Sequence, residues 1–286
     1  MEKKSTFKLF ALCAASALLL AGCHVNRRQQ AQRKATLETT VEAKHVETKS
    51  DTDLPLTQEV RQSYKLAASA RVEVSGINGL LQIETTDGSD AEVYVVRSVR
   101  NQEDFDQRKL VIEQKGDSLV VRVRNNRERS FWSMLGGRND ERQRAYLKLP
   151  RKVELEISGI NGKTDIGEIT GRVELSGLNG PVKVARATGG FNLSGANGNI
   201  EATIAQLTKG VEVHGVNGNL DLRFSGEVNA DVEVHGVNGQ ISPELPNLSV
   251  KEQKRGSLEA RLGNGGAPID VSGVNGNIHL LPAAAK

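Results

Sequence analysis

The distribution of apolar and polar residues along the chain is typical of short β-strands that end at glycine-rich corners. The tetrad Val-Glu-Val-His at 211–214 alternates with a period of two, which places its valines on one side of a strand and its polar residues on the other. The same tetrad recurs at 232–235, and related tetrads occur at 173–176 and 269–272. We therefore expect repeated strands with one buried face and one solvent-exposed face.

A five-residue phrase, Ser/His-Gly-x-Asn-Gly, ends these strands and occurs seven times. It begins at Ser75, Ser158, Ser176, Ser194, His214, His235 and Ser272, and the five starts from Ser158 to His235 are 18, 18, 20 and 21 residues apart. Repetition at this period indicates similar coils that stack on one another. Because Asn-Gly tolerates positive φ, we expect the chain to turn at Asn78, Asn161, Asn179, Asn197, Asn217, Asn238 and Asn275.

These observations predict an all-β fold, a single-chain parallel β-solenoid with two strands and two glycine corners per coil of 18 to 21 residues. A meander of β-hairpins is the alternative, because Asn-Gly between alternating strands is also a strong hairpin signal. In the solenoid the turn asparagines of consecutive coils form a ladder in sequence order. The long gap between His235 and Ser272 contains Lys-Arg-Gly at 254–256, which we interpret as a substitute corner of one further coil. The last coil then has no cap.

The N-terminal segment has the features of a targeting sequence rather than of a folded domain. Three lysines precede an apolar run from Leu9 to Leu20, which is too short to span a bilayer, and Leu-Ala-Gly-Cys at 20–23 follows. This tetrapeptide looks like a lipobox, in which Cys23 is lipidated with acyl chains such as palmitate. An ordinary signal peptide is the alternative. We expect a signal peptide at 1–22 and a polar flexible tether at 23–65.

The region 66–150 interrupts the repeat. We expect it to hold the first coil and a small antiparallel β-meander that caps the N-terminal end of the solenoid repeats at 151–286. Its most unusual segment, 127–144, combines aromatic and basic residues, among them Phe131, Trp132, Arg129 and Arg138. The aromatic residues either fold back as a lid over the meander or form an exposed patch for a membrane or a partner.

Acidic residues recur at one outward position of successive coils. They are Glu73, Glu156, Glu174, Glu212, Glu233 and Asp270, with Asn192 as an interruption. Four interpretations remain open: a solvated face that discourages sheet aggregation, a strip that binds a cationic or sugar-like envelope polymer, a weak divalent-metal site, and carboxylate-based glycan cleavage. The metal candidates are Glu212, His214, Glu233 and His235.

Composition and motifs exclude several classes of function. The chain has 38 Lys and Arg against 35 Asp and Glu, and three of those lysines lie in the signal segment, so strong non-specific nucleic-acid binding is not expected. The sequence has no Gly-x-Ser-x-Gly elbow, no phosphate-binding glycine loop and no paired-histidine protease motif. We predict a protein without cofactor that is not an enzyme. The narrow aliphatic core agrees with 3% aromatic residues and 29 glycines.

The lipobox, the Leu149-Pro150 pair and the recurring Gly-x-Asn-Gly-x-Ile/Leu turns resemble a bacterial family. This is the putative-adhesin family of β-strand-repeat envelope proteins of unknown function, and the resemblance covers about residues 66 to 282. It implies a glycine-punctuated solenoid without established catalytic residues, and some related proteins act in envelope-stress sensing.

The resulting hypothesis is a lipid-anchored protein of the bacterial envelope, at the outer membrane if the host has two membranes. It binds an envelope polymer or protein, as an adhesin or scaffold. The alternatives are an envelope-stress sensor that acts through a protein partner, a structural protein that polymerises end to end, and, least favoured, a glycan-active enzyme. The sequence does not determine the oligomeric state.

Overall fold

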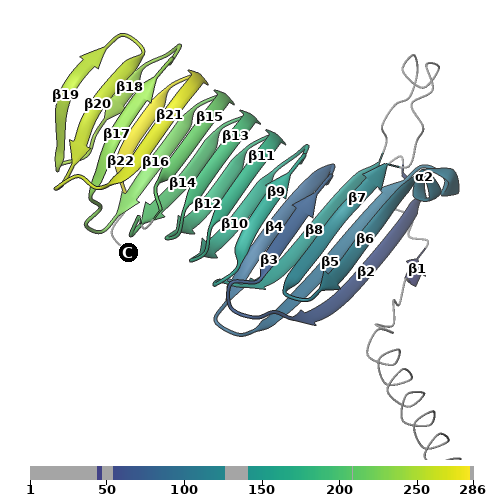
Figure 1. The fold of residues 1–286 in the computed structure, drawn as a ribbon. Coiled ribbons are helices and arrows are strands. Elements are labelled where there is room, and N and C mark those ends of the chain that lie inside the picture. Colours follow the sequence, from purple (N-terminus) through teal and green to yellow (C-terminus); the bar gives the residue numbers. More distant parts are fainter. Residues whose placement is uncertain (1–43, 47–53, 126–140, 208, 284–286) are drawn as a thin grey trace, which may run out of the picture. The chain divides into compact units, whose positions relative to one another are not determined.

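The computed structural model describes residues 44–46, 54–125, 141–207 and 209–283. Every described residue belongs to one compact unit, residues 43–286. Cys23 and the expected signal peptide therefore lie outside the described residues. Within the described part the fold is all-β, with two sheets and one short helix (Figure 1).

The two sheets, named sheet A and sheet B here, each contain eleven strands. In spatial order, sheet A consists of β1 (Lys44–Val46), β2 (Leu56–Lys65), β5 (Asp90–Val99), β8 (Arg142–Pro150), β4 (Gly79–Thr86), β10 (Thr164–Ile169), β12 (Val182–Ala187), β14 (Ile200–Ala205), β16 (Leu220–Ser225), β22 (Ile278–Pro282) and β18 (Ile241–Pro243). Sheet B consists of β19 (Leu248–Lys254), β20 (Ser257–Leu262), β17 (Ala230–His235), β21 (Ala267–Asn275), β15 (Val211–Asn217), β13 (Phe191–Asn197), β11 (Val173–Asn179), β9 (Glu154–Ser158), β3 (Arg71–Ser75), β7 (Ser118–Asn125) and β6 (Arg108–Lys115).

Each repeat is one solenoid coil, as the sequence predicts. A strand in sheet B runs into the Asn-Gly corner, a strand in sheet A follows, and a second corner returns the chain to sheet B. Neighbouring strands of successive coils are parallel and in register, so that Val173 lies beside Phe191 and Phe191 beside Val211. The parallel β-solenoid is therefore confirmed, and the hairpin meander is excluded for these coils.

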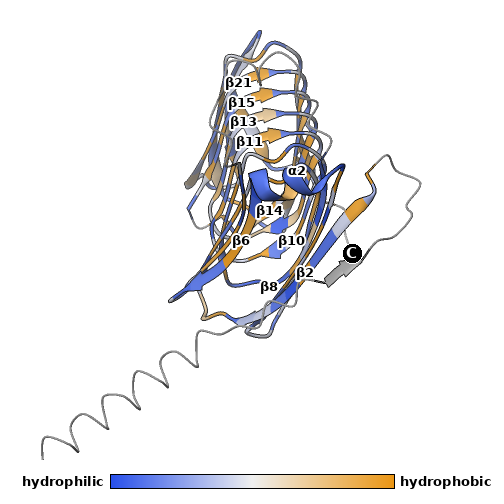
Figure 2. Ribbon diagram, turned by 90° about the vertical axis from the view of Figure 1, so that its right-hand side faces the viewer, coloured by the Kyte–Doolittle hydropathy of each residue, from blue (hydrophilic) through white to orange (hydrophobic). Residues whose placement is uncertain are grey.

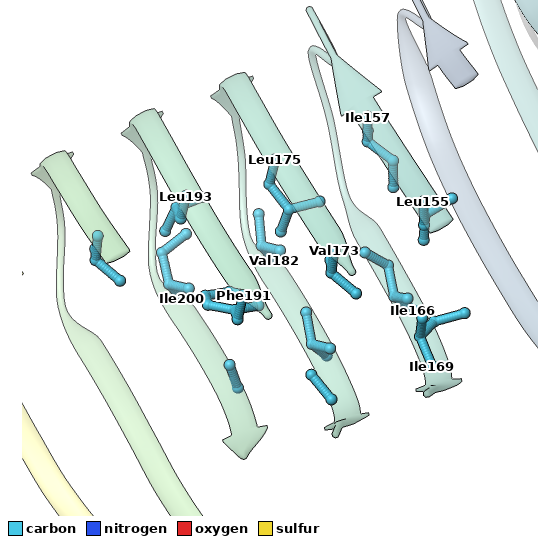
Figure 3. Packing of buried hydrophobic residues seen from close by; sticks show 14 of the residues in the cluster. Leu155, Ile157, Ile166, Ile169, Val173, Leu175, Val182, Phe191, Leu193 and Ile200 are labelled. Atoms are coloured by element: carbon cyan, nitrogen blue, oxygen red, sulfur yellow. The ribbon is translucent and has the colours of Figure 1, made fainter. Parts of the chain in front are cut away.

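The core lies between the two sheets and is built from the inward side chains of every coil. Leu155, Val173, Leu175, Phe191 and Leu193 of sheet B are almost completely buried. They face aliphatic side chains of sheet A such as Ile166, Val182 and Ile200 (Figure 3). Apolar and polar residues alternate along the strands, so hydrophobic and hydrophilic segments alternate along the ribbon (Figure 2). The period of two thus directs each coil's apolar half inward.

The corners differ from the expected turn in one respect. Positive φ falls on the glycines of the phrase, for example +59° at Gly177 and +140° at Gly180, and not on the asparagine. The second glycine is needed for close approach, since a Cβ on Gly180 would lie 2.3 Å from the carbonyl oxygen of Gly162. The asparagines keep extended backbone and bond along the stack instead, with Nδ2 of Asn179 donating to Oδ1 of Asn161 at 2.9 Å.

The coils do not all stack in sequence order, which corrects the prediction. Strand β21 lies between β15 and β17 in sheet B, and β22 lies between β16 and β18 in sheet A (Figure 1). The C-terminal coil is thus inserted between the coil of β15 and β16 and the coil of β17 and β18. The asparagine ladder accordingly runs from Asn217 to Asn275 and ends at Asn238.

The Lys-Arg-Gly segment at 254–256 is not a solenoid corner, which corrects a second prediction. It joins β19 to β20, an antiparallel hairpin whose strand β20 pairs antiparallel with β17. The turn of this hairpin requires a residue with positive φ, which accounts for Gly256 at φ +78°. The C-terminal coil, β21 and β22, is therefore not an uncapped end, because it lies inside the stack. Sheet B ends instead at β19, whose exposed edge carries Lys251, Glu252 and Lys254, and charged edge residues oppose pairing between molecules.

The N-terminal end of the two sheets begins earlier in the chain than predicted. Residues 56–65, which we expected in the tether, form β2 and pair antiparallel with β5. Its inward positions include Gln58 and Gln62, and these polar residues conceal the strand's alternation. Antiparallel strands do occur in 66–150, with β5 against β8 and β6 against β7. However, β8 also pairs parallel with β4, and β7 with β3, so this region extends both sheets.

A buried polar network occupies the interior at this end, close to helix α2 (Gln102–Gln107). Arg97 lies on the inward side of β5, and only 2% of its side chain is exposed. Its Nε donates to Oε1 of Glu141 at 2.9 Å, its Nη1 to Gln58 at 3.1 Å and its Nη2 to the carbonyl of Arg108 at 2.6 Å. Nη1 of Arg108 donates to the other oxygen of Glu141 at 2.8 Å. Buried charges persist when they are paired and hydrogen-bonded in this way.

Candidate functional site: the outer face of sheet B

The outer face of sheet B carries two parallel columns of polar side chains, one residue from each coil. We call the first the acidic column and the second the serine-histidine column. In spatial order the acidic column contains Glu73, Glu156, Glu174, Asn192, Glu212, Asp270 and Glu233. The serine-histidine column contains Ser75, Ser158, Ser176, Ser194, His214, Ser272 and His235. The predicted acidic row is thus one column, with Asp270 and Glu233 exchanged in order by the inserted coil.

Arginines neutralise the acidic column near its N-terminal end. Arg71 of β3 pairs with Glu156, and Nε of Arg172 lies 2.7 Å from Oε1 of Glu174. The hydrogen bond from Arg71 to Glu156, together with the charges of Glu156, Glu174 and Glu73, raises the pKa of Arg71. Arg71 and Arg172 each directly precede the alternating tetrad of their own coil, at 72–75 and 173–176. Two of the three acids in this part of the column, Glu156 and Glu174, therefore have an arginine partner.

Glu212, Asp270 and Glu233 lie on three adjacent strands without a comparable arginine. Glu212 and Glu233 form no ion pair within the described residues, and both are exposed. The only cation candidate beside Asp270 in that part of the chain is His235, with 4.0 Å between Nδ1 and Oδ1, beyond hydrogen-bond distance. Like charges on adjacent strands repel, so this group of three favours a counter-charge from outside. We call it the acidic triad.

The column continues into the terminal hairpin, which the sequence analysis missed. Glu259 of β20 stands beside Glu233, and Glu252 of β19 stands beside Glu259. A shallow hollow of about 510 Å³ lies over these strands, and its lining includes Glu233, Asp270, Glu252, Glu259 and Lys251. Unlike the triad, the two hairpin acids have lysine partners: Nζ of Lys251 lies 3.0 Å from Glu259, and Lys254 pairs with Glu252. The alternation of apolar and polar residues at 257–262 does indicate a strand. That this strand, β20, pairs antiparallel with β17 depends on the order of the coils, which the repeat does not reveal.

The four metal candidates do not come together. Strand β21 separates the strand of Glu212 and His214 from that of Glu233 and His235, so the two pairs are two strands apart, roughly 9.6 Å. Zinc ligands lie only about 2.0–2.3 Å from the ion, so one ion does not reach both pairs. Nδ1 of His214 contacts Oγ of Ser272 instead, at 2.5 Å. No group of three or more His, Cys, Asp or Glu suited to a metal occurs among the residues with described positions.

The outer face of sheet A offers a contrast, because three of its acids, Asp165, Glu201 and Asp221, have basic partners. Asp165 lies 2.6 Å from Lys163, and Asp221 lies 2.7 Å from Nδ1 of His279. Glu201 lies 3.5 Å from Lys183 and 3.2 Å from Nε of Arg223. The three carboxylates line one shallow hollow of about 340 Å³ together with Lys163, Lys183 and His279. The mixed charges of this face compensate one another internally.

Several predicted site residues cannot be placed. Cys23, Phe131, Trp132, Arg129 and Arg138 lie outside the described residues, so the lipidation site and the aromatic loop stay predictions. The structure does describe the end of that loop, where Glu141 is buried in the Arg97 network. The turn asparagines are all described and all belong to the ladder, from Asn78 to Asn238. In the described part of the chain, no helix combines the length and apolar character needed to cross a membrane.

Comparisons with known proteins identify the repeat region. Residues 163–281, less than half of the chain, match the family model described as Toastrack DUF4097, a description that names no activity. A structure titled "putative cell adhesion protein" from Clostridium sporogenes is 12% identical, with a TM-score of 0.41, and the match covers 79% of this chain and 100% of that one. A "putative adhesin" from Bacteroides fragilis is 11% identical, with a TM-score of 0.33, and covers 83% and 99%.

A further solved structure, a "putative lipid binding protein" from Parabacteroides distasonis, is 12% identical, with a TM-score of 0.27, and the match covers 79% of this chain and 97% of that one. No curated protein matches the chain. The region matched by the family model contains Glu174, Glu212, Asp270 and Glu233 of the acidic column.

Proposed function

We propose that this protein is a non-enzymatic, lipid-anchored binding protein of the bacterial envelope. Its acidic triad, Glu212, Asp270 and Glu233, engages a cationic group of an envelope polymer or protein. The observation that carries the proposal is the contrast in charge compensation. Asp165, Glu201 and Asp221 of sheet A and Glu156 and Glu174 of sheet B have basic partners, whereas the triad has no arginine or lysine partner within the described residues.

The geometry supports a long, repetitive partner rather than a small molecule. The triad repeats one carboxylate per strand, at roughly 4.8 Å intervals, and it ends at the terminal hairpin, where Glu259 is already paired with Lys251. A flat row of equally spaced charges attracts a polymer with repeated cationic groups and does not enclose a small ligand. The same face has a row of serine and histidine side chains beside the carboxylates, which supplies hydrogen-bonding groups to a polar partner.

Binding of a synthetic lysine polymer to the full-length protein tests the role of the triad. The variant E212Q/D270N/E233Q removes three charges with little change of shape. We expect it to weaken binding roughly tenfold at low salt, because each exposed charge is worth up to about 0.5 kcal/mol and tenfold equals about 1.4 kcal/mol. Added salt should reduce binding of the native protein, since exposed charges are screened within about 10 Å at 0.1 M.

A matched control removes three acids from the other face. D165N/E201Q/D221N changes the net charge by the same amount, but these carboxylates already have basic partners. It should retain native binding. Equal binding by the two triple variants would refute the triad as the binding surface, and the same pair of variants then serves for pull-downs from envelope extract. Unchanged melting temperatures confirm that both variants are folded.

Membrane anchoring is a separate part of the proposal and has its own test. Full-length protein expressed in a bacterium should partition into the detergent phase, and C23A should lose this behaviour while its β-structure is kept. The lipobox at 20–23 supports this expectation. Recovery of native and C23A protein in the same aqueous fraction would remove the anchor from the proposal and leave the binding face unaffected.

A further inference from the structure

The asparagine ladder has seven members, and the coil order leaves one of them at its open end. In six corners the second glycine donates its backbone N–H to the asparagine carbonyl of the next coil. These bonds join Gly79 to Asn161, Gly162 to Asn179, Gly180 to Asn197, Gly198 to Asn217, Gly218 to Asn275 and Gly276 to Asn238, at 2.8 to 3.2 Å. The seventh glycine, Gly239, belongs to the last coil of this stack, so no next corner follows it.

The end corner differs from the others in three respects. The N–H of Gly239 makes no hydrogen bond within the described residues, and Oδ1 of Asn238 accepts none there. Gly239 is exposed, whereas the six equivalent glycines are only partly exposed. Nδ2 of Asn238 still donates to Oδ1 of Asn275 at 3.0 Å, so the side chain itself remains in the ladder. Among the seven corners of the ladder, the open end therefore leaves only the backbone nitrogen of Gly239 without a hydrogen bond within the described residues.

That nitrogen is the nucleophile of asparagine deamidation. In this reaction it attacks Cγ of the preceding asparagine and loses its proton. The bond from Cγ to Nδ2 breaks, and Nδ2 leaves as ammonia with that proton. One water then adds to the cyclic imide. Opening at Cγ yields aspartate, and opening at the α-carbonyl yields isoaspartate. Glycine favours ring closure because it has no Cβ to crowd the ring.

We propose that Asn238 is a spontaneous deamidation site and that the ladder protects the other six turn asparagines. A hydrogen-bonded amide must first break its bond and rotate before it reaches Cγ, and protection of this kind depends on local opening. The product adds one negative charge to the corner of the coil that carries Glu233. Asn264, which also precedes a glycine, lies in a turn outside the ladder, and Gly265 donates to the carbonyl of Leu262 at 3.2 Å.

Peptide mass spectrometry of the aged, folded full-length protein at mildly alkaline pH tests the proposal. Conversion of each asparagine is followed by the exchange of NH for O in its peptide. We expect Asn238 to convert roughly tenfold faster than the other six turn asparagines, which corresponds to about 1.4 kcal/mol, near the upper end of one hydrogen bond. In urea the seven rates should become similar, because each sequence is Asn-Gly. Equal rates in the folded protein, or a slower rate at Asn238, would overturn the proposal.

The variant N275A separates backbone protection from side-chain protection. It removes the amide that links Asn238 to Asn217 through Asn275, but it keeps the backbone bond from Gly218 to the carbonyl of residue 275. We expect Asn217 to stay slow in this variant and Asn238 to stay fast. If Asn217 instead becomes as fast as Asn238, the backbone nitrogen is not the cause. A melting curve confirms that N275A is folded during the incubation.

Discussion

The solenoid coils and the N-terminal end of the same two sheets fill their interiors differently. The coils from β9 onward bury almost only aliphatic side chains, in register from one coil to the next. At the N-terminal end, among β2, β5, β8 and α2, the interior contains Arg97, Glu141 and Gln143, each at most 4% exposed. A repeated coil always meets another apolar surface, whereas the end of a stack does not. Specific polar pairing there replaces general apolar packing.

Because of this difference, we expect the two regions to respond differently to single substitutions. Aliphatic packing in a coil is spread over many similar contacts, so neighbouring coils share the effect of one substitution. The Arg97 network concentrates two buried charges and a buried carbonyl bond in one place. Removing one partner of a buried pair leaves the other charge without compensation.

Arg97→Met should be the most destabilising of these changes. It leaves Glu141 buried with Arg108 as its remaining cation and removes the donor to Gln58. We expect a loss of about 3–5 kcal/mol in the free energy of unfolding, measured by urea denaturation. Arg142→Met, at an exposed position of β8, is the control and should change the free energy of unfolding by less than about 0.5 kcal/mol. A loss for R97M below about 1 kcal/mol, the range of exposed ion pairs, would contradict this view.

Gly180→Ala tests whether the coils depend on backbone approach rather than on side-chain packing alone. Its Cβ would lie 2.3 Å from the carbonyl oxygen of Gly162, at φ +140°. We expect a loss of about 3 kcal/mol or more, from the strained backbone and the overlap together. Gly226→Ala also places alanine at a positive φ, +79°, but with open space around its Cβ, so about 1–2 kcal/mol is expected. Equal losses in denaturant would remove close approach as the cause.

Thr164→Val asks whether the coil interior gains from becoming wholly apolar. Thr164 is completely buried, and its Oγ1 has no hydrogen-bond partner in the described structure. Its neighbours in register are Leu81 and Val182, so valine fits the pattern. We expect a gain of about 1–2 kcal/mol by calorimetry or denaturation.

The matched control is Thr170→Val. Oγ1 of Thr170 donates to the carbonyl of Arg151 at 3.1 Å, so this change should cost about 1 kcal/mol. If T164V destabilises the protein as much as T170V does, the hydroxyl of Thr164 has a partner after all.

Asp231→Asn should have the smallest effect and depends on pH. A hydrogen bond from Arg261, together with one from the backbone of Gly266, lowers the pKa of Asp231 from its ordinary value of 3.8. Its contribution to stability is therefore present above 3.8 and is lost as the pH falls through the lower, folded value. The native protein should melt slightly above D231N near pH 6, and the two should converge at strongly acidic pH. A difference that persists unchanged in acid would contradict this assignment.

The coils were predictable from the repeat because each coil contains both the alternation that sets its buried face and the phrase that sets its corner. Alternation placed Val211 and Val213 in the core, and the phrase placed every turn asparagine in the ladder. The neighbours of the final coils were not predictable in this way. The tetrads at 211–214 and 232–235 are identical, and both fit beside the strand that begins at Ala267. Local pattern therefore does not determine which coil inserts between the others.

Polar residues on inward positions account for the other differences. Gln58 and Gln62 made β2 resemble a solvated tether, and Arg97 on the inward side of β5 is recognisable only once Glu141 is placed beside it. These two residues are 44 positions apart in the chain. The acidic column was predictable as a row, but its uncompensated part was not. That part depends on which arginines stand beside which coil.

The inserted C-terminal coil has a consequence for the order of folding. A repeat array that stacks in sequence order grows coil by coil as the chain emerges from the ribosome or the translocation channel. Here the coil of β17 and β18 is synthesised before the strands that support it, and its place remains one strand-width away from the finished stack until residues 267–282 arrive. The stack is therefore completed only once residues 267–282 have been synthesised, and a chain that stops before them lacks the coil between β15–β16 and β17–β18.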